Sequence, residues 1–374
     1  MMNNIILKHP ALAQLASLSA QPPAGPANLL GCTLQELSDF AQTSGQPAYR
    51  GKQLFEALFK HRVQSFDEIT NLPKTFRAAL EDQYVISRPS MDQIEVSEDG
   101  TRKYRFAGPD GLAYESVYIP QVAKGRKTNT LCVSSQTGCA VGCGFCYTAS
   151  LRRNRNLAAS EIVGQVLAVQ DDVASLGETA TVTNLVYMGM GEPLLNYDQV
   201  VQSANILLAE EGPAFSSRRI TISTSGIVPR IYDLGNDLPT QLAISLNATT
   251  NESRTRIMPI NKKWPLEELI ESLRQYPLKN RRKFTIEYVL LSGINDSDDD
   301  AKRLIKLLSD IPVKINLLPL NDHDRTEFTP PSRNRVYAFQ AILKNAGMNV
   351  LLRTPRGQDI SAACGQLGET VNAA

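Results

Sequence analysis

Hydrophobic positions change their period twice along the chain. Between residues 30 and 87 they recur at helical spacing, as at Leu34, Leu37 and Phe40. Between residues 92 and 120, the segments DQIEVS, KYRFAG and YESVYIP alternate apolar and polar residues, which predicts short strands. Beyond that region, short apolar runs alternate with helical patterns. The chain is therefore expected to hold a small helical part, a short β segment and a larger α/β part.

The larger part contains six apolar runs that predict strands at 131–135, 184–190, 219–225, 242–248, 284–291 and 314–320. Helical patterns separate them, such as the face formed by Ile162, Val166 and Val169. Strands that alternate with helices imply a parallel sheet with right-handed crossovers. We expect an α/β fold, a partial or complete (β/α) barrel, with a doubly wound open sheet as the alternative.

These patterns divide the chain into five expected segments. Residues 1–29 read as a flexible lead-in without an apolar core of signal-peptide length. A helical accessory domain over 30–90 is followed by a β linker over 91–125, whose end belongs to the basic loop QVAKGRKTNT. The barrel is expected over 126–367, with a short tail at 368–374.

Composition and charge exclude several classes of protein. Of the 374 residues, 42% are hydrophobic and 21% are charged, as in an ordinary soluble globular protein. The formal net charge is +1, so a surface for nucleic acid has to be local. The chain has no apolar run long enough to predict a membrane helix.

The cysteines are clustered and the histidines lie elsewhere. Four of the six cysteines, Cys132, Cys139, Cys143 and Cys146, fall within fifteen residues, which is poor spacing for a disulfide framework and good spacing for a metal site. The three histidines are distant in sequence, so metal chemistry here is thiolate chemistry. Free thiolates persist in a reducing compartment, which predicts a cytoplasmic protein.

The triplet Cys139, Cys143 and Cys146 has the spacing C-x3-C-x2-C, directly after a predicted strand. Three thiolates can hold a cuboidal iron–sulfur cluster and leave one iron open for substrate. The alternative is a structural zinc site with Cys132 as fourth ligand. Such sites usually use two close cysteine pairs, and Cys132 lies inside the predicted strand, so the cluster is favoured.

Several ordered motifs resemble the RlmN/Cfr family of radical-SAM RNA adenine methyltransferases. They are LCVSSQTGCAVGCGFCYTA, MGMGEPLLNY, STSGIVP, MPINKKW, KINLLPLN and RGQDISAACGQ, preceded by YRGKQLFEALF, SFDEITNLPK and YESVYIP. The resemblance covers about residues 30–367 and implies the partial (β/α) barrel of the radical-SAM type, with an N-terminal helical domain that docks RNA.

The resemblance also implies the cofactors. The cysteine triplet would hold a [4Fe–4S] cluster, and two molecules of S-adenosylmethionine (SAM) would be used per turnover. The matching SAM-binding positions are Gly191, Glu192, Ser223, Ser245, Leu246, Asn247 and Asn321. By itself, the Gly-Glu-Pro segment favours an ordinary turn after a strand over a SAM site.

Methylation of an adenine ring carbon requires a radical route, because C2 and C8 are not nucleophilic enough to attack a sulfonium methyl group. The resemblance implies that Cys364 accepts a methyl group from one SAM. A 5′-deoxyadenosyl radical from the second SAM then activates that methyl group for addition to the base. The resemblance makes Glu115 the proton acceptor and Cys132 the thiol that resolves the adduct by a disulfide with Cys364. On the residues alone, all three read as ordinary packing or surface positions.

The implied activity is methylation of adenosine at C2 in 23S rRNA, with tRNA as a second substrate and a protein such as flavodoxin as electron donor. Methylation at C8 or of another RNA stays open, because Arg152, Arg153 and Asn247 depart from the family's usual residues. A non-catalytic iron–sulfur RNA-binding protein is a third hypothesis, against which the presence of both Cys132 and Cys364 weighs.

Local basic runs are the candidate contacts to RNA phosphates. They comprise Lys124, Arg126 and Lys127; Arg152, Arg153 and Arg155; and Arg281, Arg282 and Lys283.

Overall fold

The computed structural model describes residues 27–368 except 124–125, 152–153 and 176–181, and only the backbone of 122–127 where it is described. Lys124, Arg152 and Arg153 thus lie outside the described residues, as do the side chains of Arg126 and Lys127 and the predicted lead-in up to residue 26. Within the described ranges, none of the helices combines the length and the apolar character that crossing a membrane requires.

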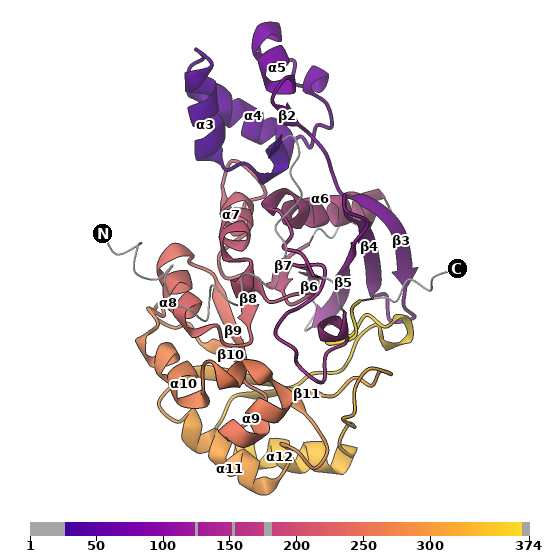
Figure 1. Cartoon of the computed structure of the whole chain (residues 1–374), viewed down its shortest axis with the longest axis vertical. Coiled ribbons are helices and arrows are strands. Elements are labelled where there is room, and N and C mark those ends of the chain that lie inside the picture. Colours follow the sequence, from indigo (N-terminus) through magenta and orange to yellow (C-terminus); the bar gives the residue numbers. More distant parts are fainter. Residues whose placement is uncertain (1–26, 124–125, 152–153, 176–181, 369–374) are drawn as a thin grey trace.

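The N-terminal helices form a unit at one end of the molecule, beyond α6 and α7 (Figure 1). They are α3 (Leu34–Thr43), α4 (Tyr49–Phe59) and α5 (Lys74–Glu81), with β1 (Ala27–Asn28) paired in parallel with β2 (Tyr84–Val85). Thr33 begins α3 with a capping box, because its hydroxyl accepts from the Glu36 amide while the Glu36 carboxylate accepts from the Thr33 amide. The helical reading of residues 30–87 is confirmed.

The β segment after this unit is part of the main sheet. Strands β3 (Ser90–Val96), β4 (Arg102–Ala107), β5 (Ala113–Ala123) and β6 (Arg126–Cys132) pair antiparallel in succession. The strands predicted over 92–120 are present, but they extend the sheet rather than link two domains. The expected basic loop over 121–130 instead forms the ends of the β5–β6 hairpin.

From β6 onward the sheet is parallel, and its order follows the chain to β12. The strands are β7 (Asn184–Tyr187), β8 (Ile220–Thr224), β9 (Gln241–Ser245), β10 (Phe284–Leu290), β11 (Val313–Pro319) and β12 (Val350–Leu352). All six predicted strands exist, and β12 was missed. A doubly wound sheet reverses its strand order, so the uninterrupted order shows a partial barrel.

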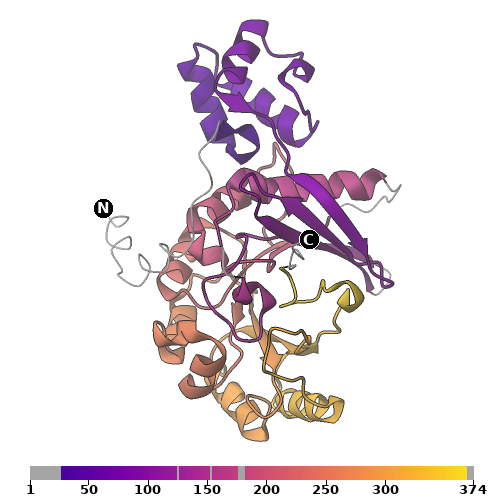
Figure 2. The same cartoon turned by 45° about the vertical axis from the view of Figure 1, so that its right-hand side comes forward.

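Helices cover the outer face of the curved sheet (Figures 1 and 2). They are α6 (Ala159–Ser175), α7 (Tyr197–Leu208), α8 (Val228–Asp237), α9 (Asn251–Ile257), α10 (Leu266–Gln275), α11 (Asp298–Leu307) and α12 (Arg333–Asn345). Side chains along β10 alternate between the two faces of the sheet. Ile286 and Tyr288 are fully buried, whereas Glu287 and Val289 line the interior cavity.

The C-terminal segment joins the two sides of the partial barrel. After β12, Arg356 donates to the carbonyl of Pro120 on β5 at 2.9 Å. The amide of Gly357 donates to Asp99 at 3.1 Å, and Ser97 donates to Asp359 at 2.6 Å. This segment, yellow in Figure 2, lies beside the antiparallel strands and leads into the predicted carrier cysteine.

Candidate functional site

One cavity is lined by residues of the parallel strands and of the loops that follow them. Its volume is about 980 Å³ including its open mouth. Ten predicted site residues line it: Cys139, Cys143, Cys146, Gly191, Glu192, Ser223, Ser245, Asn247, Asn321 and Cys364. Leu246, Glu115 and Cys132 do not. Convergence at the carboxyl ends of the strands is what a parallel barrel predicts for an active site.

The cysteine triplet lies on the loop after β6, where the backbone is held from two sides. Gly144 donates its amide to the carbonyl of Ile257 at 2.9 Å, and Cys146 donates to the carbonyl of Cys143 at 3.1 Å. Gly142 has a φ of 76°, a left-handed conformation that glycine adopts readily. Burial is the largest cause of the raised pKa of the Cys143 thiol. A metal that binds this thiol therefore has to displace its proton.

The triplet fits an iron–sulfur cluster by its donor chemistry and by the open space beside it. The three cysteines line a cavity of about 980 Å³ including its open mouth, which has room for a substrate ligand beside the cluster. Within the described ranges, no three His, Cys, Asp or Glu side chains are grouped as ligands of a single ion. Cys132 is the fourth ligand of the zinc alternative. Besides burial, the charge of Cys364 raises the pKa of Cys132.

The Gly191–Glu192 pair follows β7 and lines the same cavity as the triplet. Gly191 has a φ of 99°, and a Cβ atom there would lie 2.5 Å from Cβ of Gln136, so a side chain is excluded. The Glu192 carboxylate accepts from the amides of Ser225 at 2.7 Å and Leu194 at 3.0 Å. Burial raises the pKa of Glu192, and these hydrogen bonds oppose the rise.

Residues 245–247 differ in what each offers to the cavity. Ser245 lines it directly. Leu246 is fully buried, so only its backbone can act near a ligand. Asn247 adopts a φ of 57° and lines the cavity, but its side chain accepts from the Val289 amide at 2.8 Å and donates to the Met258 sulfur at 3.2 Å. Asn247 therefore braces β10 and the cavity wall.

Cys364 lies in the carrier loop, which we define as residues 362–368. The side-chain amide of Asn321 donates to the carbonyl of Cys364 at 2.9 Å. On the other side, the amide of Tyr147, next to the last cysteine of the triplet, donates to the carbonyl of Gly365 at 2.7 Å. Cys364 itself is exposed and lines the cavity. Desolvation by the protein atoms around the thiol, followed by the Glu287 carboxylate, raises the pKa of Cys364 to about 11.

Glu115 and Cys132 lie beneath the carrier loop. Glu115 on β5 is buried, and its carboxylate accepts from the amide of Gly368 at 3.0 Å. Cys132 ends β6 and is buried; burial, followed by the charge of Cys364, raises its pKa. The structure thus brings all three predicted catalytic residues to one region, with both cysteines free.

Glu287 is a cavity residue that sequence reasoning missed. It lies on β10 between Ser245 on β9 and Asn316 on β11, and the Asn316 amide donates to its carboxylate at 2.8 Å. Burial raises its pKa. An acidic residue between the fully buried Ile286 and Tyr288 was the available signal, because alternation places it on the inner face of the strand.

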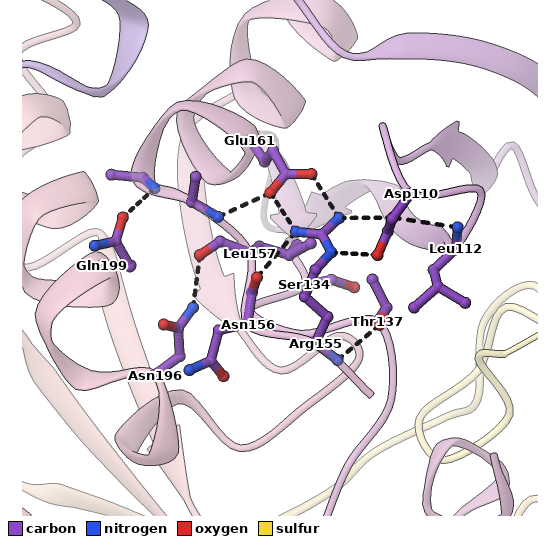
Figure 3. A network of polar contacts seen from close by, with 12 residues as sticks. Asp110, Leu112, Ser134, Thr137, Arg155, Asn156, Leu157, Glu161, Asn196 and Gln199 are labelled. Carbon is purple, nitrogen blue, oxygen red and sulfur yellow. Dashed lines mark hydrogen bonds and ion pairs between the residues drawn. The ribbon is translucent and has the colours of Figure 1, made fainter. Parts of the chain in front are cut away.

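Two of the basic residues predicted to contact RNA, Arg155 and Arg282, are engaged inside the protein, whereas Arg281 and Lys283 are exposed. Arg155 is 2% exposed, and Figure 3 shows its guanidinium between Asp110 and Glu161, each at 2.7 Å. Arg282 donates to Ser217 at 2.9 Å and to the carbonyl of Thr240. The run 281–283 also precedes β10, at the end of the strands away from the cavity.

Comparisons with known proteins agree with this geometry. Residues 133–305 match the sequence model of the radical SAM superfamily, and residues 27–86 match that of the ribosomal RNA large subunit methyltransferase N-terminal domain. The dual-specificity RNA methyltransferase RlmN of Geobacter sulfurreducens is 49% identical over 340 residues, which is 91% of each chain. The protein of that name from Roseobacter denitrificans is 43% identical over 96% of this chain and 93% of its own. A solved radical SAM methyltransferase from Sphaerobacter thermophilus superposes with a TM-score of 0.83 at 40% identity, covering 91% of this chain and 99% of the other.

Proposed function

Because the chain belongs to the RlmN family of RNA methyltransferases within the radical SAM superfamily, we propose that it methylates C2 of adenosine in RNA. One observation carries the assignment: the cysteine triplet and Cys364 line the same cavity. The 2.7 Å hydrogen bond between Tyr147 and Gly365 connects the loops that carry them. A protein that only bound RNA would need no exposed thiol beside a cluster site.

We assign the triplet as cluster ligands. Gly191, Glu192, Ser223 and Ser245 would line the place of SAM, as would the Leu246 backbone, Asn247 and Asn321. Bound together, the cluster and SAM supply a methyl group and an organic radical. The residues of the protein would orient SAM and the RNA base, exclude water from the cavity and move protons. Glu192 holds the loop after β8 through its hydrogen bond to Ser225 at 2.7 Å, which fixes that wall before a ligand arrives.

Cys364 would carry the methyl group as a thioether, since its thiol faces the cavity. Asn321 and Tyr147 hold the backbone on both sides of that sulfur. Glu115 would accept the proton lost from the adenine carbon. The Cys132 thiolate would then attack the Cys364 sulfur. The S–S bond forms, the bond between that sulfur and the methylene carbon breaks, and the carbon keeps the electron pair and takes up a proton, so that the methylated base leaves. Electrostatic coupling of the two cysteines supports this pairing.

The partners follow from the exposed parts of the site. Gly142 and Gly144 of the cluster loop are exposed, so a one-electron donor protein such as flavodoxin could approach the cluster there. We propose 23S rRNA and tRNA as the RNA substrates. The dual specificity in the relatives' name and the match to the ribosomal RNA large subunit methyltransferase N-terminal domain support this proposal. The N-terminal helices are our candidate for RNA docking. Free thiols suit a reducing cytoplasm.

The experiment is anaerobic reconstitution followed by turnover on unmethylated rRNA and tRNA. The protein should take up about four irons per chain and form 2-methyladenosine. Cys364→Ala should assemble the same cluster but form no methylated RNA, whereas Cys139→Ala should lose both. Tightly bound zinc without iron, or 8-methyladenosine as the product, would contradict the proposal.

A further inference from the structure

A buried arginine beside the cavity has no acidic partner in the part of the chain that the structure describes. Arg254 on α9 is 0% exposed. Its guanidinium donates to the carbonyls of Ser225 at 2.6 Å and Leu246 at 3.1 Å, and to the side-chain oxygen of Asn261 at 3.1 Å. These acceptors are neutral. A buried charge is costly unless an opposite charge offsets it, so the site is incomplete without an anion.

Arg155 shows how the same chain treats a buried arginine elsewhere. That residue is 2% exposed and forms ion pairs with both Asp110 and Glu161. The two residues are thus alike in burial and differ in charge compensation. The lack of a carboxylate hydrogen-bonded to Arg254 therefore distinguishes this arginine from Arg155.

The helix of Arg254 packs against the cluster loop. Ile257 on α9 accepts the hydrogen bond from Gly144 at 2.9 Å, and Met258, directly after the helix, lines the cavity. Burial lowers the pKa of Arg254 to about 10, and the thiolate of Cys143 acts in the opposite direction. The guanidinium therefore stays protonated at neutral pH. Its hydrogen bonds to the carbonyls of Ser225 at 2.6 Å and Ser245 at 3.3 Å join it to two residues that line the same cavity as the cysteine triplet.

We propose that Arg254 is a positioning residue whose fixed positive charge offsets the negative charge of the thiolate-bound cluster and raises its reduction potential. The inference rests on the proposed function, which places the cluster on this triplet. Reduction adds one electron to an already anionic group. A cation held nearby in a medium of low dielectric constant favours the reduced form. Its hydrogen bonds to Ser225 and Leu246 would keep that charge in place while ligands exchange.

Four substitutions separate charge from packing. Arg254→Gln removes the charge, and Arg254→Lys retains it with fewer hydrogen bonds. Asn261→Asp keeps the arginine. It replaces the side-chain amide that accepts a hydrogen bond from Arg254 at 3.1 Å with a carboxylate. Arg256→Gln is the matched control, because Arg256 is an exposed arginine on the same helix, where solvent screens its charge.

The measurement is a redox titration of each reconstituted protein, without SAM or RNA, followed by the electron paramagnetic resonance signal of the reduced cluster. We expect more negative midpoint potentials for Arg254→Gln and Asn261→Asp, and potentials close to wild type for Arg254→Lys and Arg256→Gln. Iron content and the spectrum of the wild type report separately on the proposed function, which fails if no cluster assembles.

Two results overturn the charge assignment while leaving the cluster in place. One is a wild-type potential in Asn261→Asp. The other is a shift in Arg254→Lys as large as that in Asn261→Asp. Both comparisons stay decisive if Arg254→Gln does not assemble a cluster, because neither depends on that variant.

Discussion

Gly368 donates its backbone amide to the buried carboxylate of Glu115 at 3.0 Å. The bond ties the end of the carrier loop to strand β5 of the antiparallel part of the sheet. The proposed proton acceptor and the proposed methyl carrier therefore occupy one hydrogen-bonded unit, although 249 positions separate residue 115 from residue 364. A substitution of Glu115 can therefore affect both the proposed proton transfer and the position of the carrier loop.

Glu115→Gln separates these two roles. The glutamine oxygen can still accept from Gly368, so the carrier loop should stay in place, but the side chain can no longer accept a proton at neutral pH. We expect methylation of Cys364 to persist and release of methylated RNA to fall by about 100-fold or more. Peptide mass spectrometry and nucleoside analysis measure the two steps. Wild-type turnover in this variant would remove Glu115 from the chemistry.

Arg155→Met tests whether Arg155 stabilises the protein through internal ion pairs or contacts RNA. Removing the guanidinium leaves Asp110 and Glu161 without their shared partner in a largely buried place. Loss of one side of a buried ion pair costs about 3–5 kcal/mol of unfolding free energy, and the exposure of Asp110 favours the lower figure. Chemical denaturation of the protein measures this loss. Normal stability with weakened RNA binding would instead restore the sequence-based interpretation.

The aspartate contacts of the C-terminal segment predict how it responds to acid. Burial tends to raise the pKa of Asp99, but hydrogen bonds from Thr101 and Gly357 and the charge of Arg356 lower it to about 2. Because the folded pKa lies below the unfolded value, the contribution to stability is complete above pH 4 and is lost as the pH falls towards 2.

Hydrogen exchange at the Gly357 amide, corrected for the intrinsic rate, should report this loss. Protection should be constant down to about pH 4 and decrease below it. Asp99→Asn should reduce protection at neutral pH, whereas Asp324→Asn is a control, because Asp324 is an exposed carboxylate outside these contacts. Loss of protection already between pH 7 and pH 5 would show that another group holds the segment.

Periodicity predicted the strands because each inward or outward position depends on local alternation. The order of strands and helices predicted a (β/α) barrel with an open sheet as the alternative, and the radical-SAM type was implied by the family resemblance. Periodicity missed β12, whose three residues are too few to show a period. It also misread Arg155, since a run of arginines does not show which of them turns inward. The partners of Arg155 are 45 and 6 positions away, and Arg254 forms hydrogen bonds with three separate segments of the chain. The partners of these two arginines are brought to them by the tertiary fold, so the local sequence pattern could not predict them.

Removal of the Cys132 thiol should stop release of the product without stopping its attachment. If Cys132 attacks the Cys364 sulfur, Cys132→Ala leaves the carbon–sulfur bond to adenine intact, and protein should stay covalently joined to RNA. A denaturing gel with and without ribonuclease, followed by mass analysis of the Cys364 peptide, detects this species. A purely structural role predicts only a loss of about 1 kcal/mol in stability.

Two controls make the gel decisive. Cys32→Ala removes a partly buried thiol of the N-terminal helical unit and should give no adduct, although it also shortens a packed side chain. The double variant Cys132→Ala with Cys364→Ala should lose the adduct, because the attachment point is gone. Normal turnover of Cys132→Ala without a nuclease-sensitive band would assign Cys132 to packing and would require another thiol to resolve the intermediate. Cys132 is buried, and the charge of Cys364 contributes to raising its pKa, which favours formation of the adduct in Cys132→Ala.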